Sequence, residues 1–274
     1  MNNLDNWSAN KMRFTYLAFA LILLVLLSQT TFADTNKINM VHAGKEGYHL
    51  YGNDEQLQGD YFAIVCQGAR ECILKRSQVN MKAKRFDSYD GMVDGFELTS
   101  NFPQSLFLVK GIKGLSESAL QTWYYDKVFL KDPFDASKTG KLTNTYSKTL
   151  NINQEALKIY GQWTKEKVPN CRDEPCTGKV MQWKYSYLGI ERTLSKLGTD
   201  PIASDMGDWV PSVDFFLVWV GDLDGDNQPD LLVRPSNRTD SLDLELYLST
   251  QLLVGQPWKP AAHFHYWDPT NPGC

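Results

Sequence analysis

The sequence predicts a mainly β protein of antiparallel sheets, in a sandwich-like or partial propeller-like arrangement, with one or two short helices. Three observations lead to this prediction. Several segments alternate apolar and polar residues with a period of two, one continuous apolar run is too short for a buried helix, and turn-forming residues separate these segments. An α+β fold is the alternative.

In chain order, the alternating segments are residues 79–84, 157–163, 181–187 and 242–248. Because successive side chains of a strand point to opposite faces, each segment offers one apolar face to a core. The last segment (LDLELYL) is the clearest, since its four leucines share one face and its acids and tyrosine share the other. The continuous apolar run at residues 215–220 (FFLVWV) predicts a central strand.

Helical signals are few. Residues 116–126 (SESALQTWYYD) predict one short helix with Ser116 as its N-cap. A second helix could begin at residues 153–159, although the alternation there favours a strand. Residues 132–153 are polar and rich in turn formers, so they form either a boundary between two parts or a long surface loop. Otherwise we expect residues 34–274 to form a single domain.

The first 33 residues have the order of a secretory signal peptide. Lys11 and Arg13 precede an apolar stretch at residues 14–27, and a short segment ending in Ala33 offers small residues for cleavage. We therefore expect an exported protein of the bacterial-envelope type, located in the periplasm or outside the cell. An uncleaved membrane anchor is the alternative, but the apolar stretch is shorter than the roughly 20 residues that span a bilayer. No stable membrane insertion is expected after cleavage.

The net charge of the whole chain is −4. Without residues 1–33 it becomes −5, because Lys11, Arg13 and Asp5 are removed. This mildly acidic balance argues against a nucleic-acid partner, which requires a basic surface.

Five cysteines follow the predicted signal peptide, as expected for a chain exported to an oxidising compartment. We predict two local disulfides, Cys66–Cys72 at the neck of a hairpin and Cys171–Cys176 across a polar turn. Spacing alone does not fix the connectivity. A zinc site of four thiolates is the alternative, and neither spacing has the C-x-x-C form typical of it. Cys274 is left without an assigned role.

The segment 222–230 (DLDGDNQPD) carries the chemistry that is clearest in the sequence. Four carboxylates this close repel one another unless a cation lies among them. Calcium accepts six to eight oxygen ligands in a flexible geometry. We therefore predict one structural calcium ion, bound by the main-chain carbonyl of Gln228 and by the side chains of Asp222, Asp224, Asp226 and Asp230. A solvated acidic turn without an ion is the alternative.

This loop differs from an EF-hand, which has a glutamate at position twelve and flanking helices. Position twelve here is Val233, and both flanks predict strands. The segment instead resembles the calcium loop of FG-GAP repeats, found in the propellers of integrin alpha chains. The resemblance covers about a dozen residues and occurs once, so it implies one calcium-clamped hairpin and not a propeller. Asn227 stands where that family has glycine, and asparagine tolerates the left-handed conformation.

Other candidate site residues are less specific. His263 and His265 are two residues apart and would share one face of a strand, where they could hold a transition metal, but the sequence shows no third ligand. Two aromatic clusters, residues 123–125 and 266–267, could line a glycan-binding or protein-binding surface, although a core position is the simpler interpretation. No catalytic residue is predicted.

Together these observations predict an exported, calcium-binding, non-enzymatic protein that binds another protein, as an inhibitor or immunity-type partner would. A carbohydrate-binding module with a glycan ligand is one alternative. A hydrolase without a recognisable motif is another.

Overall fold

The computed structural model describes residues 37–42, 57–68, 70–88, 91–131, 146–167, 177–198, 213–235, 241–252 and 258–267. The predicted signal peptide lies outside these residues, as do Cys171, Cys176, Cys274 and residues 132–145. Residues 38–274 form one compact unit. Within the described ranges, no helix has the length and hydrophobicity needed to cross a membrane.

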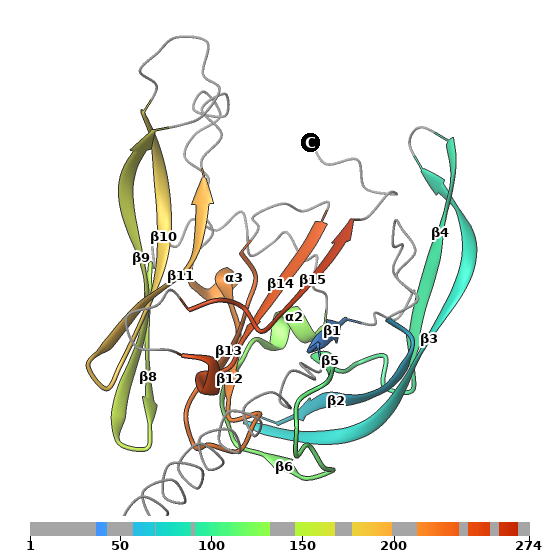
Figure 1. Cartoon of the computed structure of the whole chain (residues 1–274), viewed down its shortest axis with the longest axis horizontal. Coiled ribbons are helices and arrows are strands. Elements are labelled where there is room, and N and C mark those ends of the chain that lie inside the picture. Colours follow the sequence, from blue (N-terminus) through green and yellow to red (C-terminus); the bar gives the residue numbers. More distant parts are fainter. Residues whose placement is uncertain are drawn as a thin grey trace, which may run out of the picture. The chain divides into compact units, whose positions relative to one another are not determined.

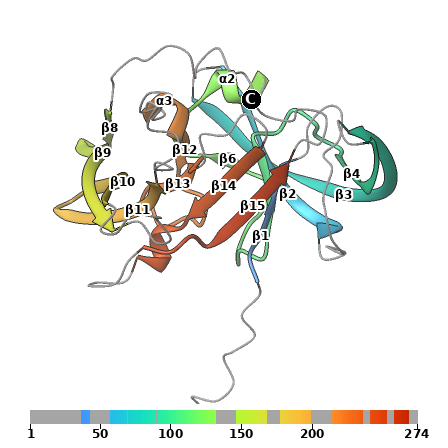
Figure 2. The same ribbon diagram turned by 90° about the horizontal axis from the view of Figure 1, so that it is seen from above.

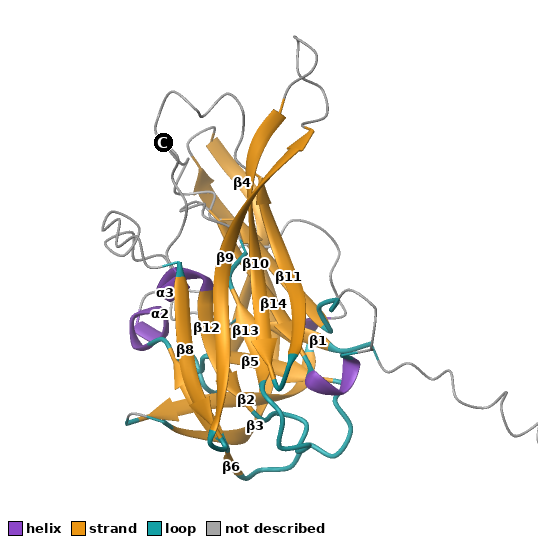
Figure 3. Ribbon diagram, turned by 90° about the vertical axis from the view of Figure 1, so that its left-hand side faces the viewer, coloured by secondary structure: helices purple, strands orange, loops and turns teal. Residues whose placement is uncertain are grey.

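The prediction of a mainly β fold is confirmed, because antiparallel sheets account for most of the described chain (Figure 3). The first sheet has the order β1-β5-β2-β3-β4, with β6 paired to β3 (Figure 1). Its strands are β1 (Asn39–Val41), β2 (Gly59–Gln67), β3 (Glu71–Ser88), β4 (Gly91–Ser100), β5 (Phe107–Lys110) and β6 (Ala119–Leu120).

Two further sheets follow. The four-stranded sheet has the order β11-β10-β9-β8, and what we call the middle sheet has the order β15-β14-β13-β12-β7. The four-stranded sheet contains β8 (Ser147–Ile152), β9 (Glu155–Lys167), β10 (Thr177–Tyr187) and β11 (Ile190–Gly198). The middle sheet contains β7 (Thr122–Tyr125), β12 (Leu217–Gly221), β13 (Asp230–Val233), β14 (Ser241–Tyr247) and β15 (Ala262–Trp267). The described helical segments are short: α2 (Lys127–Lys131), α3 (Val213–Phe216) and the 3₁₀ turn η4 (Ser249–Gln251).

The central strands β12 and β13 of the middle sheet are buried on both faces. One face shares a hydrophobic cluster with the first sheet, and the other shares a second cluster with the four-stranded sheet. Strand β14 shows the division, because Leu242, Leu244 and Leu246 enter the first cluster while Tyr247 enters the second. The alternation predicted for residues 242–248 is therefore confirmed, with both faces partly covered. Figure 2 shows β14 and β15 side by side, and β15 in turn contacts β1.

Strand β12 explains the continuous apolar run in the sequence. All five of its residues are buried, because it lies between β7 and β13 in the middle sheet. Val218 and Trp219 both enter the first cluster, although neighbouring residues of a regular strand face opposite ways. A register shift between Leu217 and Trp219 accounts for this, as expected of a β-bulge. The predicted central strand is thus present, but it begins at Leu217, after the short helix α3.

The helix predicted for residues 116–126, with Ser116 as its N-cap, is wrong. These residues contain strands β6 and β7 instead. Trp123 is buried in the second cluster and Tyr125 in the first. Both residues belong to β7, a strand of the middle sheet, which lies between these two clusters. Tertiary packing here overrides a weak local helix signal. Residues 153–159 belong to the turn and second strand of the β8–β9 hairpin, as their alternation favoured.

Candidate metal centre

The acidic loop joins two buried strands of the middle sheet. Gly221 at the end of β12 pairs with Asp230 at the start of β13, so both ends of the loop are fixed by the sheet. Gly225 has φ 82° and Asn227 has φ 61°. The left-handed conformation expected of Asn227 is therefore confirmed, and it allows the chain to turn back within the loop.

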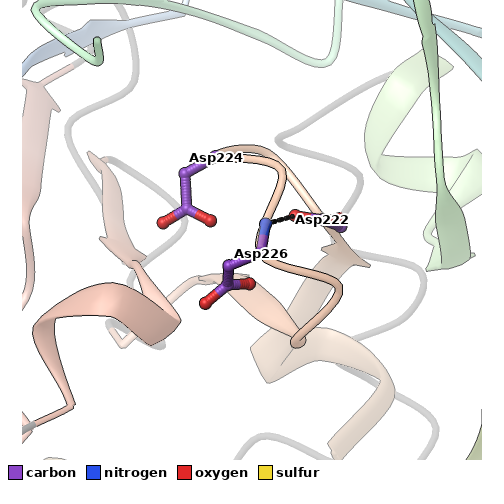
Figure 4. A group of neighbouring side chains, drawn as sticks. All are labelled: Asp222, Asp224 and Asp226. Atoms are coloured by element: carbon purple, nitrogen blue, oxygen red, sulfur yellow. Dashed lines mark hydrogen bonds between the residues drawn. The ribbon is translucent and has the colours of Figure 1, made fainter. Parts of the chain in front are cut away.

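Three of the predicted ligands converge within this loop. Asp222, Asp224 and Asp226 each offer a carboxylate oxygen, and these oxygens lie within 4.8 Å of one another (Figure 4). Asp222 is buried, while Asp224 and Asp226 are partly exposed. The group has the donor atoms and the spacing to hold a metal ion.

Asp222 organises the main chain of the loop. Its Oδ1 accepts hydrogen bonds from the main-chain N–H groups of Gly225 (2.8 Å) and Asp226 (3.1 Å), the second drawn as a dashed line in Figure 4. Its Oδ2 accepts a hydrogen bond from the N–H of Asn227 (2.9 Å). These bonds hold the turn without an ion, because a carboxylate that accepts several main-chain N–H groups fixes the backbone around it.

One carboxylate oxygen of Asp224 has no hydrogen-bond partner among the described residues. The Oδ2 atom of this aspartate accepts a hydrogen bond from the hydroxyl of Thr250 (2.6 Å). Its Oδ1 is inaccessible to solvent and receives no hydrogen bond within the described part of the chain. Burial raises the pKa of Asp224, and the negative charges of Asp226 and Asp222 raise it further. A cation beside this oxygen would offset both effects.

Asp230 lies outside the converging group of three. Its Oδ2 accepts a hydrogen bond from the N–H of Leu223 (2.6 Å), and its Oδ1 accepts two from Ser249, one from the N–H (2.7 Å) and one from the hydroxyl (3.0 Å). Burial raises the pKa of Asp230 to about 8, with a further contribution from the charge of Asp224. Asp230 therefore connects the loop to η4, whatever part it takes in binding an ion.

The remaining predicted ligand, Gln228, is half-buried, and its N–H donates a hydrogen bond to Oδ1 of Asp226 (2.8 Å). The other oxygen of Asp226, Oδ2, accepts a hydrogen bond from the hydroxyl of Ser249 (2.8 Å). Sequence reasoning missed Ser249 and Thr250, because they lie about twenty residues beyond the loop. Only the pairing of β13 with β14 brings η4 to the acids.

No side-chain cation of the described residues pairs with the acids of the 222–230 loop. A cavity of about 300 Å³ adjoins the loop and is lined by Asp222, Asp224 and Gly225 together with residues 114–116 and 118–121. An ion from solution could therefore enter this cavity, where no side-chain cation of the described residues neutralises the acids.

The other predicted site features have separate outcomes. The Cys66–Cys72 disulfide is confirmed, and it joins β2 to β3 at the neck of their hairpin. Trp123, Tyr125 and Tyr266 are buried in the hydrophobic clusters, so they do not form an exposed platform for a glycan. The predicted Cys171–Cys176 bridge lies outside the described residues.

Comparisons with known proteins identify no relative. No protein-family model, no curated protein and no solved structure matches the chain.

Proposed function

We propose that this chain is an exported calcium-binding protein in which one ion fixes the 222–230 loop. The observation that carries the proposal is the convergence of Asp222, Asp224 and Asp226, with Oδ1 of Asp224 buried and without a hydrogen-bond partner in the described chain. Three carboxylates in one partly buried place are stabilised by a divalent cation. Export is supported by the Cys66–Cys72 disulfide, which persists in an oxidising compartment.

Calcium is the ion that suits this set of ligands. Every candidate ligand atom is an oxygen, from carboxylates and from the carbonyl of Gln228, and zinc or copper sites usually include nitrogen or sulfur. Magnesium requires a stricter octahedral shell and retains several waters. The loop is short and offers its oxygens from several side chains, which fits the adaptable coordination of calcium.

The expected role of the ion is structural. The loop connects β12 to β13, the two neighbouring strands that are fully buried in the middle sheet, and it touches η4 through Asp224, Asp226 and Asp230. An ion that neutralises the loop would therefore stabilise the junction of three segments. The proposal assigns no catalytic activity to this site.

Calcium titration of the purified exported chain tests the proposal. In calorimetry we expect one equivalent to bind, and at a hundredfold excess over Kd the free energy of unfolding should rise by about 2.7 kcal/mol. Asp224→Asn should abolish most of this gain. Asp87→Asn, at an exposed acid of β3, is the matched control and should leave it unchanged. Equal melting temperatures with calcium and with EDTA would refute the proposal.

We further propose that the chain binds a protein partner, as an inhibitor or immunity-type protein does, through the tip of the β10–β11 hairpin. Leu188 occupies the first position of this turn and Ile190 follows it, with exposed fractions of 54% and 36%. Leu188 has φ 49°, a left-handed conformation that a leucine adopts at a cost. The proposed contact rests on this exposed leucine being held in a backbone conformation that costs energy.

The partner contact is testable by capture from an envelope extract. A partner retained by the wild-type chain should be lost with Leu188→Glu and kept with Glu117→Gln, a change at an exposed acid of another segment. Equal capture by the wild-type chain and Leu188→Glu would exclude this tip as the contact.

A further inference from the structure

Strand β15 carries two exposed histidines that the calcium proposal does not use. His263 and His265 alternate with the buried Ala262, Phe264 and Tyr266, so both rings stand on the same open face of the sheet, as the sequence predicted. The rings are nearly parallel, with an interplanar angle of 21° and centroids 6.5 Å apart. Their side chains are 51% and 58% exposed, so an ion in solution can reach them.

A carboxylate that the sequence did not place beside the histidines lies on the neighbouring strand. Asp243 on β14 lies directly across from His265, and its Oδ1 is 2.5 Å from Nδ1 of that ring. The same oxygen is 3.7 Å from Nε2 of His263. One carboxylate oxygen is thus the common neighbour of two imidazoles from the adjacent strand.

A second carboxylate completes the group. Glu245 lies directly across from His263 in the β14–β15 register, and its charge acts on that ring. The hydroxyl of Tyr247 donates a hydrogen bond to Oε2 of Glu245 (2.7 Å), which holds this carboxylate on the same face. Two imidazoles on one strand therefore face two carboxylates on the next.

We propose that His263, His265 and Asp243 form a second metal site, for a borderline transition-metal ion such as Zn²⁺, Cu²⁺ or Ni²⁺, with Glu245 adding negative charge beside it. Two imidazole nitrogens and a carboxylate oxygen are the donors that these ions prefer. The site is separate from the all-oxygen loop, which suits calcium. The two sites therefore differ in ligand chemistry as well as in position.

Among the described residues, the ligand atoms of His263, His265 and Asp243 do not all lie within 4.8 Å of one another, so an ion would have to draw the two rings together. Ligand atoms bonded to one tetrahedral zinc ion are about 3.3 Å apart, given bonds of about 2.0–2.2 Å. The two oxygen–nitrogen distances, 2.5 and 3.7 Å, lie on either side of that value. On binding an ion, the ring of His265 has to withdraw slightly and that of His263 has to approach. Exposed side chains on a strand can make both movements by rotation alone.

Copper binding to the purified chain of residues 34–274, with millimolar calcium present, tests this proposal. We expect one Cu²⁺ per chain and an electron paramagnetic resonance spectrum with hyperfine coupling to two nitrogens. His263→Ala and His265→Ala should each reduce the coupling to one nitrogen and weaken the affinity at least about tenfold. Asp243→Asn should weaken the affinity without removing a nitrogen, and Asp87→Asn is the control expected to change neither.

Three outcomes would overturn the proposal. One is that no Cu²⁺ binds at micromolar concentration, and another is that the His263→Ala/His265→Ala double variant binds it as well as the wild-type chain does. The third is that binding is lost with Asp224→Asn while both histidine variants keep it, because the ion would then occupy the acidic loop. Circular dichroism of each variant checks the fold, and the exposure of both rings predicts that the fold is retained.

Discussion

Asp230 and Ser249, nineteen residues apart, are joined by two hydrogen bonds to one carboxylate oxygen, from the N–H of Ser249 at 2.7 Å and from its hydroxyl at 3.0 Å. The same hydroxyl also lies 2.8 Å from Oδ2 of Asp226. Ser249 is therefore the point at which η4 is attached to the acidic loop. The attachment depends on the pairing of β13 with β14, which places the end of one strand beside the start of the other.

Ser249→Ala should lower the free energy of unfolding by about 1–3 kcal/mol, because it removes a hydrogen bond to buried or partly buried carboxylates. The same change should weaken calcium binding, since Asp226 loses the group that orients it. Urea denaturation and calcium calorimetry measure the two effects. Ser147→Ala, at an exposed serine of β8, is the control and should change stability by less than about 0.5 kcal/mol. Equal stability of both variants would show that the hydroxyl contributes little.

The burial of His42 predicts that the free energy of unfolding falls at acidic pH. It is buried against Phe129, with ring centroids 5.5 Å apart, and burial lowers its pKa from 6.5 to about 4. In the unfolded chain the histidine takes up a proton near pH 6.5, whereas in the folded chain it does so only near pH 4. The unfolded state therefore binds more protons between these values, and stability falls as the pH falls through this window.

The corresponding experiment compares the wild-type chain with His42→Gln between pH 7 and 4. The variant lacks the titrating group, so its free energy of unfolding should decline less steeply with falling pH, whatever its absolute stability. The difference in decline should be at most about 3 kcal/mol, the equivalent of the change in pKa. Parallel curves for the two proteins would contradict the assignment.

The Cys66–Cys72 disulfide closes a short loop, so it should stabilise the fold by about 2 kcal/mol. The hydroxyl of Tyr125 donates a hydrogen bond to the carbonyl of Gly68 within that loop (2.5 Å), which ties the hairpin tip to β7. The Cys66→Ser/Cys72→Ser double variant should lose the disulfide contribution. A reducing agent should lower the melting temperature of the wild-type chain and leave that of the variant unchanged. Equal sensitivity of both proteins would show that another bridge is responsible.

Two glycines in strands should respond differently to substitution by alanine. A Cβ at Gly221 would lie 2.2 Å from Cζ2 of Trp219 and 2.6 Å from the carbonyl oxygen of Gln121, and neither the buried ring nor the backbone can move away. A Cβ at Gly161 would lie 2.5 Å from Sδ of Met181, which belongs to a flexible side chain. We expect Gly221→Ala to cost about 3 kcal/mol and Gly161→Ala about 1 kcal/mol. Chemical denaturation measures both, and a reversed order would contradict this account.

Sequence patterns predicted the features that depend on near neighbours in the chain. The alternation at residues 242–248, the Cys66–Cys72 bridge and the left-handed Asn227 each follow from a few adjacent residues. The converging acids of the loop were identifiable for the same reason. Periodicity also marked His263 and His265 as sharing one face of a strand.

Features that depend on distant pairing were not predictable in this way. Residues 122–125 look helical in isolation, and they are extended because β12, almost a hundred residues later, pairs with them. Ser249 and Thr250 are ordinary polar residues in the sequence, and only the fold brings them to the acids. Asp243 lies opposite His265 through a strand register that no local pattern specifies. The burial of β12 and β13 on both faces likewise follows only from the arrangement of three sheets.

At Leu188, unlike at the positions above, one substitution is expected to stabilise the fold. It occupies the first position of the β10–β11 turn with φ 49°, followed by Gly189 with φ 74°, and Asn-Gly is the dipeptide that such a turn favours. Leu188→Asn should therefore raise the free energy of unfolding by about 0.5–1 kcal/mol, the scale on which a residue gains by matching its backbone conformation. Leu188→Ala, which removes the exposed side chain without favouring the left-handed conformation, should give no such gain. If the leucine is retained for a partner, Leu188→Asn should stabilise the chain and weaken capture of that partner together, whereas a loss of stability would show that the side chain packs within the fold.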